Sequence, residues 1–344
     1  MRPAETEGIP GAGVPSGATA QVAGATAAVP GSVTVSPATS AVVVNHNAGE
    51  HLQRCVESLL VAGAVRVVVV DNASGDGSAE ALRARRDLPS VRVVDAGTNL
   101  GYGSAVNRGM ATLAEELVLV CNPDVVVETG TLQELAGVLA AAPVAGVAGP
   151  SIWNTDGSLY PSARRFPSYI EAGVHALAGL FVPGNRLSRR YRMEGELGTP
   201  GEGEPVGVGE AVRDNSGTKA RQVDWVSGAI FLARRRALEE VRGFDEGYFM
   251  YGEDVDLCWR LGRAGWGVLY VPGARAVHEG AVSTSRQPYR MILAHHRSTL
   301  RFAVKTSTGW RRLLVPAAAA VLGIRLVAAL LRQQRSGKHR RPPA

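Results

Sequence analysis

The chain has 344 residues, 45% of them hydrophobic, so it can bury a sizeable core, and one α/β domain of ordinary size remains once flexible ends are set aside. Residues 301–344 carry ten Lys and Arg and no Asp or Glu. The other 300 residues hold 27 basic and 31 acidic side chains, a net charge of −4. This charge gives no reason to expect nucleic-acid binding. Cys55, Cys121 and Cys258 have no C-x-x-C spacing, which favours reduced cytosolic thiols over a disulfide framework or a zinc site.

Residues 1–38 consist almost entirely of Ala, Gly, Pro, Thr, Ser and Val without periodicity, which is typical of a disordered leader. The segment lacks the continuous apolar run of a signal peptide, and Glu5 and Glu7 stand where positive charge would be expected. We therefore expect the protein to stay in the cytoplasm.

From Ala41 onward, short Val-rich runs alternate with segments of helical periodicity. The expected strands cover 41–47, 66–70, 91–94 and 117–121, and the expected helices cover 52–60, a segment capped by Ser78, a segment through Asn107 and Met110, and 132–142. This alternation predicts a parallel sheet covered by helices on both faces. Ligands bind beyond the carboxyl ends of such strands, where Asn45, Asp71, Asn99 and Asp124 lie.

The middle of the chain gives a weaker pattern. Residues 193–221 are rich in Gly and Glu without periodic apolar positions, which predicts a mobile insertion. Residues 223–233 predict a single strand, and residues 235–241 predict a short helix that leads to Gly243.

The stretch from Gly243 to His278 has an unusual density of acids around an aromatic turn, Tyr248–Tyr251. Apolar residues after Glu253 recur on one helix face as far as Gly265, so Glu253 and Asp254 lie at a helix N-terminus, where the macrodipole favours carboxylates. An isolated Glu-Asp pair would more often merely start a helix. Here an expected strand, 268–271, follows, and His278 comes after a Pro-Gly turn, so a carboxylate and an imidazole could meet at one sheet edge.

Single motifs leave alternatives open. The Gly101-Tyr-Gly103 loop is a poor dinucleotide-binding fingerprint, because Val106 replaces the third glycine and the loop follows the third strand. Asp71 is either a ligand of a base or ribose or a loop starter. Asp124 is either a ligand of a divalent cation or a turn residue.

Taken together, the order of these segments over residues 40–300 resembles the family 2 glycosyltransferases of GT-A fold. The most specific pieces are VVVVDNASGDGS and GFDEGYFMYGEDVDLCWRLGRAGW. Within the family the chain is most similar to bacterial rhamnosyltransferases. The resemblance implies an α/β, Rossmann-like domain over 39–305 with a mostly parallel sheet and helices on both faces.

The resemblance also implies a role for each site residue. It makes Asp254 the general base and Asp71 a ligand of the nucleotide base. It makes Asp124 the carboxylate that holds Mg²⁺ or Mn²⁺ at the donor diphosphate, and His278 a further contact of the metal or of a phosphate. The remaining residues that it assigns to the nucleotide-sugar site are Asn45, Asn99, Gly101, Asn107, Trp225, Gly228 and Glu253. One carboxylate of the usual D-x-D is missing, because the chain has Asn122-Pro123-Asp124.

The implied function is metal-dependent, inverting transfer of one sugar, L-rhamnose from dTDP-rhamnose, to a hydroxyl of a polyprenyl-diphosphate-linked sugar. Met291 after Gln287-Pro-Tyr-Arg290 departs from the Q-x-x-R-W motif of processive relatives and favours a single addition. Two alternatives stay open: transfer of galactofuranose or N-acetylglucosamine from a UDP donor, and a catalytically silent GT-A binding protein.

The C-terminal tail, 306–344, contains the apolar segment 313–331, which is interrupted by Pro316 and Arg325. A spanning helix needs about 20 predominantly apolar residues, which this segment barely supplies. We therefore predict a helix that lies on the inner membrane surface with arginines toward anionic headgroups, so that the enzyme is peripheral. The alternative is a helix that packs on the core of the domain.

Overall fold

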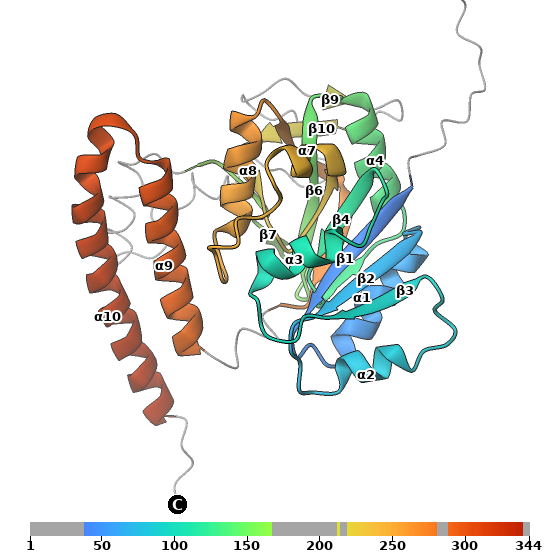
Figure 1. The fold of residues 1–344 in the computed structure, drawn as a ribbon, viewed down its shortest axis with the longest axis horizontal. Helices are drawn as coiled ribbons and strands as arrows, with labels where there is room; N and C mark the ends of the chain where they lie inside the picture. Colours follow the sequence, from blue (N-terminus) through green and yellow to red (C-terminus); the bar gives the residue numbers. More distant parts are fainter. Residues whose placement is uncertain (1–37, 167–211, 214–218, 281–287, 340–344) are drawn as a thin grey trace, which may run out of the picture. The chain divides into compact units, whose positions relative to one another are not determined.

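The computed structural model describes residues 38–166, 212–213, 219–280 and 288–339 (Figure 1). Its strands are β1 Thr39–Asn45, β2 Arg66–Asp71, β3 Val91–Asp95, β4 Leu117–Cys121, β5 Val125–Val127, β6 Ala145–Asn154, β7 Leu159–Tyr160, β8 Ala163–Arg164, β9 Val212–Arg213, β10 Lys219–Val223, β11 Trp225–Val226, β12 Ile230–Arg234 and β13 Gly267–His278. Its helices are α1 Glu50–Val61, α2 Ser78–Arg83, α3 Tyr102–Met110, α4 Thr131–Ala141, α7 Arg235–Glu240, α8 Glu253–Arg263, α9 Pro288–Thr306, the 3-10 helix η1 Gly309–Leu314 and α10 Val315–His339.

One mixed sheet organises the fold, with the strand order β3-β2-β1-β4-β12-β6-β13-β10-β9. Strands β3, β2, β1 and β4 are parallel, and β13 is parallel to β6. Strand β12 runs antiparallel between β4 and β6. The predicted α/β class with a sheet of mostly parallel strands is confirmed.

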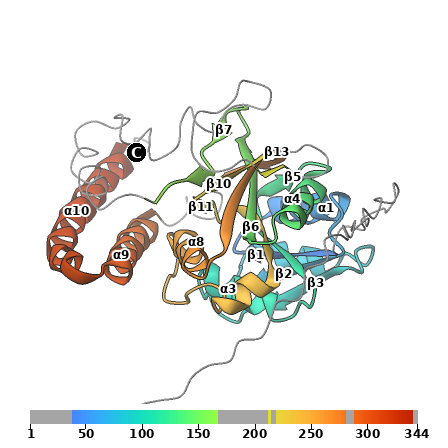
Figure 2. The same ribbon diagram turned by 90° about the horizontal axis from the view of Figure 1, so that it is seen from above.

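Two hydrophobic cores lie on opposite faces of this sheet, because successive side chains of a strand point to opposite sides. Val43, Val69 and Leu119 belong to one core, which α1 and α4 cover. Val42, Val68 and Val120 belong to the other, which α3 and α8 cover (Figure 2). The continuous Val-rich runs are therefore explained by burial on both faces, as the sequence predicted.

One local prediction is wrong, and two others fall wholly or mostly on residues that the structure does not describe. The single strand expected over 223–233 is wrong: the chain leaves the main sheet at β11, which pairs with β8, and returns as β12. The leader predicted for 1–38 and most of the insertion predicted for 193–221 lie outside the described residues, but the end of that insertion forms β9 and part of β10.

Two further boundaries also differ. Ser78 is the first residue of α2 and not its cap, and it donates its backbone N–H to the Asp76 carboxylate, 3.1 Å away. His278 does not follow a turn but ends β13, because a bulge between Val271 and Arg275 absorbs Pro272-Gly273 within the strand. The longer strand places His278 opposite Val125, the first residue of β5.

A buried ionic cluster joins α8 to α9. The Asp256 side chain is fully buried and lies 2.7 Å from Arg260 Nε and 2.7 Å from Lys305 Nζ. The Tyr248 hydroxyl donates to the same carboxylate at 3.3 Å. Lys305 also pairs with Asp245, 2.7 Å away. The cluster therefore ties the aromatic turn, the helix after it and α9 together.

We predict that Asp256→Ala lowers the free energy of unfolding by about 3 kcal/mol, because it removes a fully buried counter-ion from the half-buried Arg260 and Lys305. Urea unfolding followed by circular dichroism measures the change. Asp87→Ala removes an exposed carboxylate paired with Arg85 and serves as the control with a much smaller effect. Equal losses in the two variants would contradict a structural role for the cluster.

Candidate functional site

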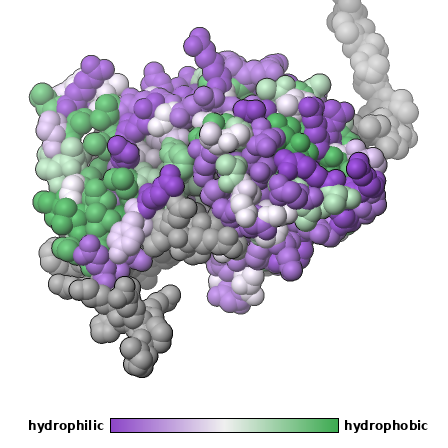
Figure 3. All heavy atoms as spheres, turned by 60° about the horizontal axis from the view of Figure 1, so that its bottom comes forward, coloured by the Kyte–Doolittle hydropathy of each residue, from purple (hydrophilic) through white to green (hydrophobic). Residues whose placement is uncertain are grey.

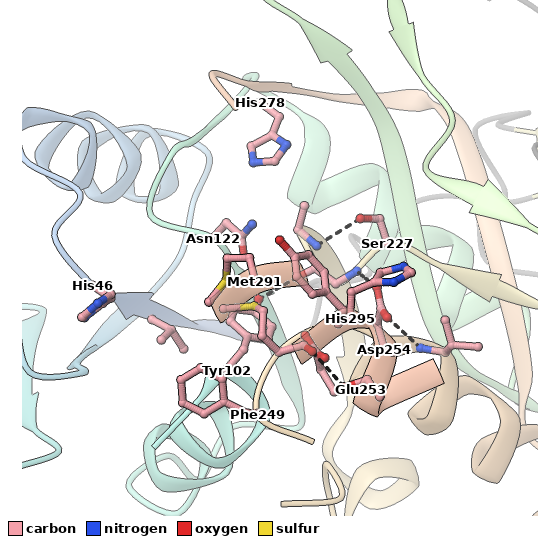
Figure 4. Close-up of a pocket in the computed structure, with 18 of the residues that line it drawn as sticks. His46, Tyr102, Asn122, Ser227, Phe249, Glu253, Asp254, His278, Met291 and His295 are labelled. Carbon is pink, nitrogen blue, oxygen red and sulfur yellow. Dashed lines mark hydrogen bonds between the residues drawn. The ribbon is translucent and has the colours of Figure 1, made fainter. Parts of the chain in front are cut away.

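A cavity of about 660 Å³ opens beyond the carboxyl ends of β1, β2 and β4 (Figure 4). Its position is that expected for a ligand site in an open α/β sheet. Seven of the predicted site residues line it: Asn99, Asp124, Trp225, Gly228, Glu253, Asp254 and His278. His46 lies at one side of the cavity in the view of Figure 4, and Asp254 lies at the other.

The adjacent acids Glu253 and Asp254 begin α8 but have different surroundings. Asp254 is half-buried, and its two carboxylate oxygens accept the backbone N–H groups of Gly228, at 2.9 Å, and Val255, at 2.8 Å. Glu253 is buried, and its Oε2 has no hydrogen-bond partner among the residues that the structure describes. Asp254 therefore has donors that stabilise its ionised form, whereas one oxygen of Glu253 has none.

These surroundings raise the pKa of both acids, but only the shift of Asp254 is opposed by hydrogen bonds and a nearby positive charge. Burial, and then the negative charge of Asp254, raise the pKa of Glu253 from 4.5 to about 8. Burial also raises the pKa of Asp254, but the Gly228 and Val255 amides and the positive charge of Arg164 oppose that shift. Burial and the charge of Asp254 thus favour the protonated form of Glu253, whereas the two backbone amides favour the ionised form of Asp254.

Gly228 positions Asp254 through both ends of its peptide. Its N–H donates to Asp254, and its carbonyl accepts the buried Tyr102 hydroxyl at 2.6 Å. A Cβ atom at Gly228 would lie 3.1 Å from the Asp254 Cβ, tighter than ordinary packing. The excursion of the chain between β11 and β12 thus brings a backbone amide to the acid, and glycine lets it approach.

Asp124 and His278 meet on another wall of the cavity. The His278 Nε2 lies 3.1 Å from Asp124 Oδ1, and the Glu279 backbone N–H donates to the Asp124 carbonyl at 2.9 Å. Arg54 and His51 of α1 hold the Glu279 carboxylate in turn. The end of β13 is therefore fixed against both the loop after β4 and α1.

This pair offers one carboxylate oxygen and one imidazole nitrogen to a cation, donor types that divalent metals accept. Within the described part of the chain no group of three or more His, Cys, Asp or Glu could hold a metal. The two side chains therefore fit an ion whose remaining ligands come from elsewhere, such as the oxygens of a bound diphosphate.

The other predicted nucleotide-side residues lie around the cavity and not among its lining residues. Asn45 is fully buried, and its Nδ2 lies 3.0 Å from Asp71 Oδ1, 3.0 Å from Ser74 Oγ and 2.9 Å from Ser78 Oγ. These contacts fix the loop that follows β2. Whether Asp71 contacts a nucleotide base remains a prediction.

Gly101 and Asn107 each bind the segment around the aromatic turn. Gly101 has φ +82°, and a Cβ there would lie 2.3 Å from the Phe249 carbonyl oxygen, so no larger residue fits. The Asn107 side chain accepts the Phe244 N–H and donates to the Phe244 carbonyl, both at 2.9 Å. Both residues hold this segment against α3.

Sequence reasoning missed several residues that line the cavity, among them Asn72, Arg164 and side chains of α9. Asn72, next to Asp71, donates to Asn99 at 3.0 Å and to the Gly101 carbonyl at 3.2 Å, and it joins the loops after β2 and β3. The Arg164 guanidinium lies 5.0 Å from the Trp225 ring centroid. Helix α9 adds a wall to the cavity with the side chains of Arg290, Met291, His295, Ser298, Thr299 and Phe302.

Comparisons with known proteins agree with this geometry. A family model described as Glycosyl transferase family 2 matches residues 40–192, and one described as Glycosyltransferase like family 2 matches residues 208–312. The chain is 42% identical over 284 residues to the N-acetylglucosaminyl-diphospho-decaprenol L-rhamnosyltransferase of Mycobacterium tuberculosis. The alignment covers 79% of this chain and 85% of that protein.

Two solved structures share the fold. The mannosyltransferase PcManGT of Pyrobaculum calidifontis with GDP-Man and Mn²⁺ has a TM-score of 0.51 and 16% identity, and the alignment covers 87% of this chain and 76% of that one. GalNAc-T7 with UDP, GalNAc and Mn²⁺ has a TM-score of 0.51 and 17% identity, over 70% of this chain and 43% of that one. The expected GT-A fold is confirmed.

We predict that the stability of the protein falls as pH rises toward 8 because of Glu253. Its folded pKa of about 8 exceeds the ordinary value of 4.5, so its contribution to stability is full below pH 4.5 and is lost as pH rises through 8. The slope is at most about 1.4 kcal/mol per pH unit for one proton.

Urea unfolding at several pH values between 5 and 8 measures this slope in the wild type, in Glu253→Gln and in Glu239→Gln, an exposed control on α7. Glu253→Gln should flatten the slope, whereas the control should keep it. Identical slopes in all three proteins would show that Glu253 is ionised throughout this range.

Proposed function

Because this chain belongs to glycosyltransferase family 2 and is therefore a glycosyltransferase, we propose that it transfers one L-rhamnose from dTDP-rhamnose to a hydroxyl of a polyprenyl-diphosphate-linked sugar. The observation that carries the proposal is that Asp254, Asp124 and His278 line the same cavity. The choice of sugar and acceptor follows the relative that is 42% identical and acts on N-acetylglucosaminyl-diphospho-decaprenol.

Asp254 is the proposed general base. An acceptor hydroxyl is a poor nucleophile at neutral pH, so a positioned carboxylate must take its proton as attack proceeds. Each oxygen of Asp254 accepts one backbone N–H and keeps lone-pair capacity for that hydroxyl. A single displacement with one base inverts the configuration at the anomeric carbon.

Asp124 and His278 are the proposed ligands of Mg²⁺ or Mn²⁺. A bound cation would offset the negative charge that develops on the departing diphosphate. The two glycosyltransferases of similar fold were solved with Mn²⁺, which supports a divalent ion at this fold. With one carboxylate in place of the usual two, the ion depends on Asp124, His278 and the donor itself.

The donor is tested by release of nucleoside diphosphate with a polyprenyl-diphosphate-linked N-acetylglucosamine as acceptor. We expect turnover with dTDP-rhamnose and little with UDP-N-acetylglucosamine or UDP-galactofuranose. Strong turnover with a UDP-sugar and none with dTDP-rhamnose would refute the rhamnose assignment. No release with any donor would favour a silent GT-A protein.

The assigned roles predict different kinetic effects for three substitutions. Asp254→Asn keeps the size and removes the proton acceptor, so transfer should fall by a factor of about 100 or more while donor binding persists. Asp124→Asn should weaken donor and metal binding together. Steady-state rates and donor titrations by calorimetry measure both.

Glu253→Gln separates the two neighbouring acids. Glutamine resembles the protonated glutamic acid that we assign at neutral pH, so this change should cost much less transfer activity than Asp254→Asn. If Glu253→Gln abolishes transfer and Asp254→Asn retains it, the roles of the two acids are reversed.

We also propose that the C-terminal helices hold the enzyme on the inner face of the cell membrane. Residues Gly309–Leu331 have a mean hydropathy of 2.2 and are long and apolar enough to cross a membrane, and none of this apolar window is buried. Trp310, Leu313 and Ile324 are 69%, 81% and 64% exposed, and apolar side chains gather over this region (Figure 3). Because Arg325 interrupts the segment, a helix that lies in the interface is favoured over a spanning one.

Deletion of residues 309–344 should abolish co-sedimentation with vesicles that contain an anionic phospholipid. Leu313→Asp should weaken it, because a charge cannot enter the apolar layer without cost. Val61→Asp alters another exposed apolar residue, on α1, which is 72% exposed against 81% for Leu313, and is the matched control. Unchanged sedimentation of the deletion variant would dismiss the membrane role.

A further inference from the structure

A second cavity, of about 520 Å³, lies between the aromatic turn and α9. Its lining residues are Gly247, Phe249, Arg290, Leu293, Ala294, Arg297, Ser298 and Arg301. Among these described residues there are three arginines and no aspartate or glutamate. The cavity is therefore basic, with a small apolar part at Leu293 and Ala294.

The spacing of the arginines makes them one feature of α9. Arg297 follows Arg290 by seven residues and precedes Arg301 by four, and at 3.6 residues per turn these intervals return to the same helix face. We call Arg290, Arg297 and Arg301 the arginine ridge. Parallel guanidinium groups on one face can bind several oxygens of one anion.

The aromatic turn orients two members of the ridge. The Arg290 guanidinium lies 5.8 Å from the Phe249 ring centroid, and that of Arg301 lies 5.2 Å from the Tyr248 ring centroid. Arg301 also donates to Asp245 at 2.9 Å, but Lys305 shares that carboxylate. Arg297 is exposed and pairs with no acid among the residues that the structure describes, so its positive charge remains available at the ridge.

The second cavity adjoins the first. Phe249, Arg290 and Ser298 line both. A ligand with an anionic group at the ridge could therefore extend past Phe249 toward Asp254 with a neighbouring hydroxyl. The Leu293 side chain, 41% exposed, lies at the same ridge and offers an apolar contact for the rest of the ligand.

We propose that the arginine ridge binds the diphosphate of the acceptor, the group that joins the prenyl chain to the first sugar. This assignment rests on the proposed function and adds the site that recognises its acceptor. It separates two diphosphates in the enzyme: the donor's lies at Asp124 and His278, and the acceptor's lies at α9. The sugar next to the acceptor diphosphate then reaches Asp254.

Calorimetric titration with farnesyl diphosphate, a soluble prenyl diphosphate, tests the ridge without a sugar donor. EDTA in the buffer prevents a divalent cation from drawing the probe to Asp124 and His278. Arg297→Ala should weaken binding by about tenfold, as expected for the loss of a charged hydrogen-bonding group. Arg297→Lys should lose less affinity, because it keeps the charge.

Three controls make the result specific. Arg86→Ala changes an exposed arginine on the loop between α2 and β3 and should bind the probe as the wild type does. Farnesol, which lacks the diphosphate, should bind the wild type and Arg297→Ala equally. Thermal unfolding of Arg297→Ala should match the wild type, so that a loss of affinity is not a loss of fold.

Equal affinities of the wild type and Arg297→Ala for farnesyl diphosphate would overturn the proposal. So would a variant that loses affinity for phosphatidylglycerol vesicles but not for farnesyl diphosphate, because the ridge would then bind lipid headgroups. Failure of the wild type to transfer any sugar would instead refute the proposed function, and the binding measurement would still decide the site.

Discussion

The candidate site depends on a constraint between two neighbouring acids, since a negative charge on Asp254 makes ionisation of the buried Glu253 costly. The backbone resolves it: Gly228 and Val255 donate to Asp254, while one oxygen of Glu253 has no partner. The Gly228 peptide is itself held by the Tyr102 hydroxyl. Helix α3, the segment between β11 and β12, and α8 thus determine together which acid faces the cavity as a carboxylate.

Helix α9 is the second element on which the site depends. Arg301 and Lys305 pair with Asp245, Lys305 also reaches Asp256, and the Ser298 hydroxyl donates to the Met250 carbonyl at 2.9 Å. The aromatic turn is therefore held between α3 and α9. Because α9 leads through η1 to α10, the helix that forms a wall of both cavities is next in sequence to the segment proposed to meet the membrane.

Much of this could be predicted from the sequence because the relevant signals are local. Val-rich runs and polar residues at strand ends predicted the sheet and placed Asn99 and Asp124 at the carboxyl ends of its strands. The break between Val226 and Ile230 could not be predicted, because β11 leaves the sheet to pair with β8, a partner distant in sequence. For the same reason, the acid-rich stretch did not reveal that Asp256 is a buried counter-ion of Lys305, or that α9 lines the cavity.

The claim that Glu253 is protonated while Asp254 is ionised is tested most directly by infrared spectroscopy of the carboxyl groups at pH 7. A protonated carboxylic acid absorbs at a different infrared frequency from a carboxylate, so its band reports a neutral acid inside the protein. The band should be present in the wild type and absent in Glu253→Gln, with Asp254 ionised in both. A band that survives unchanged in Glu253→Gln would contradict this account, because the proton would then belong to another acid.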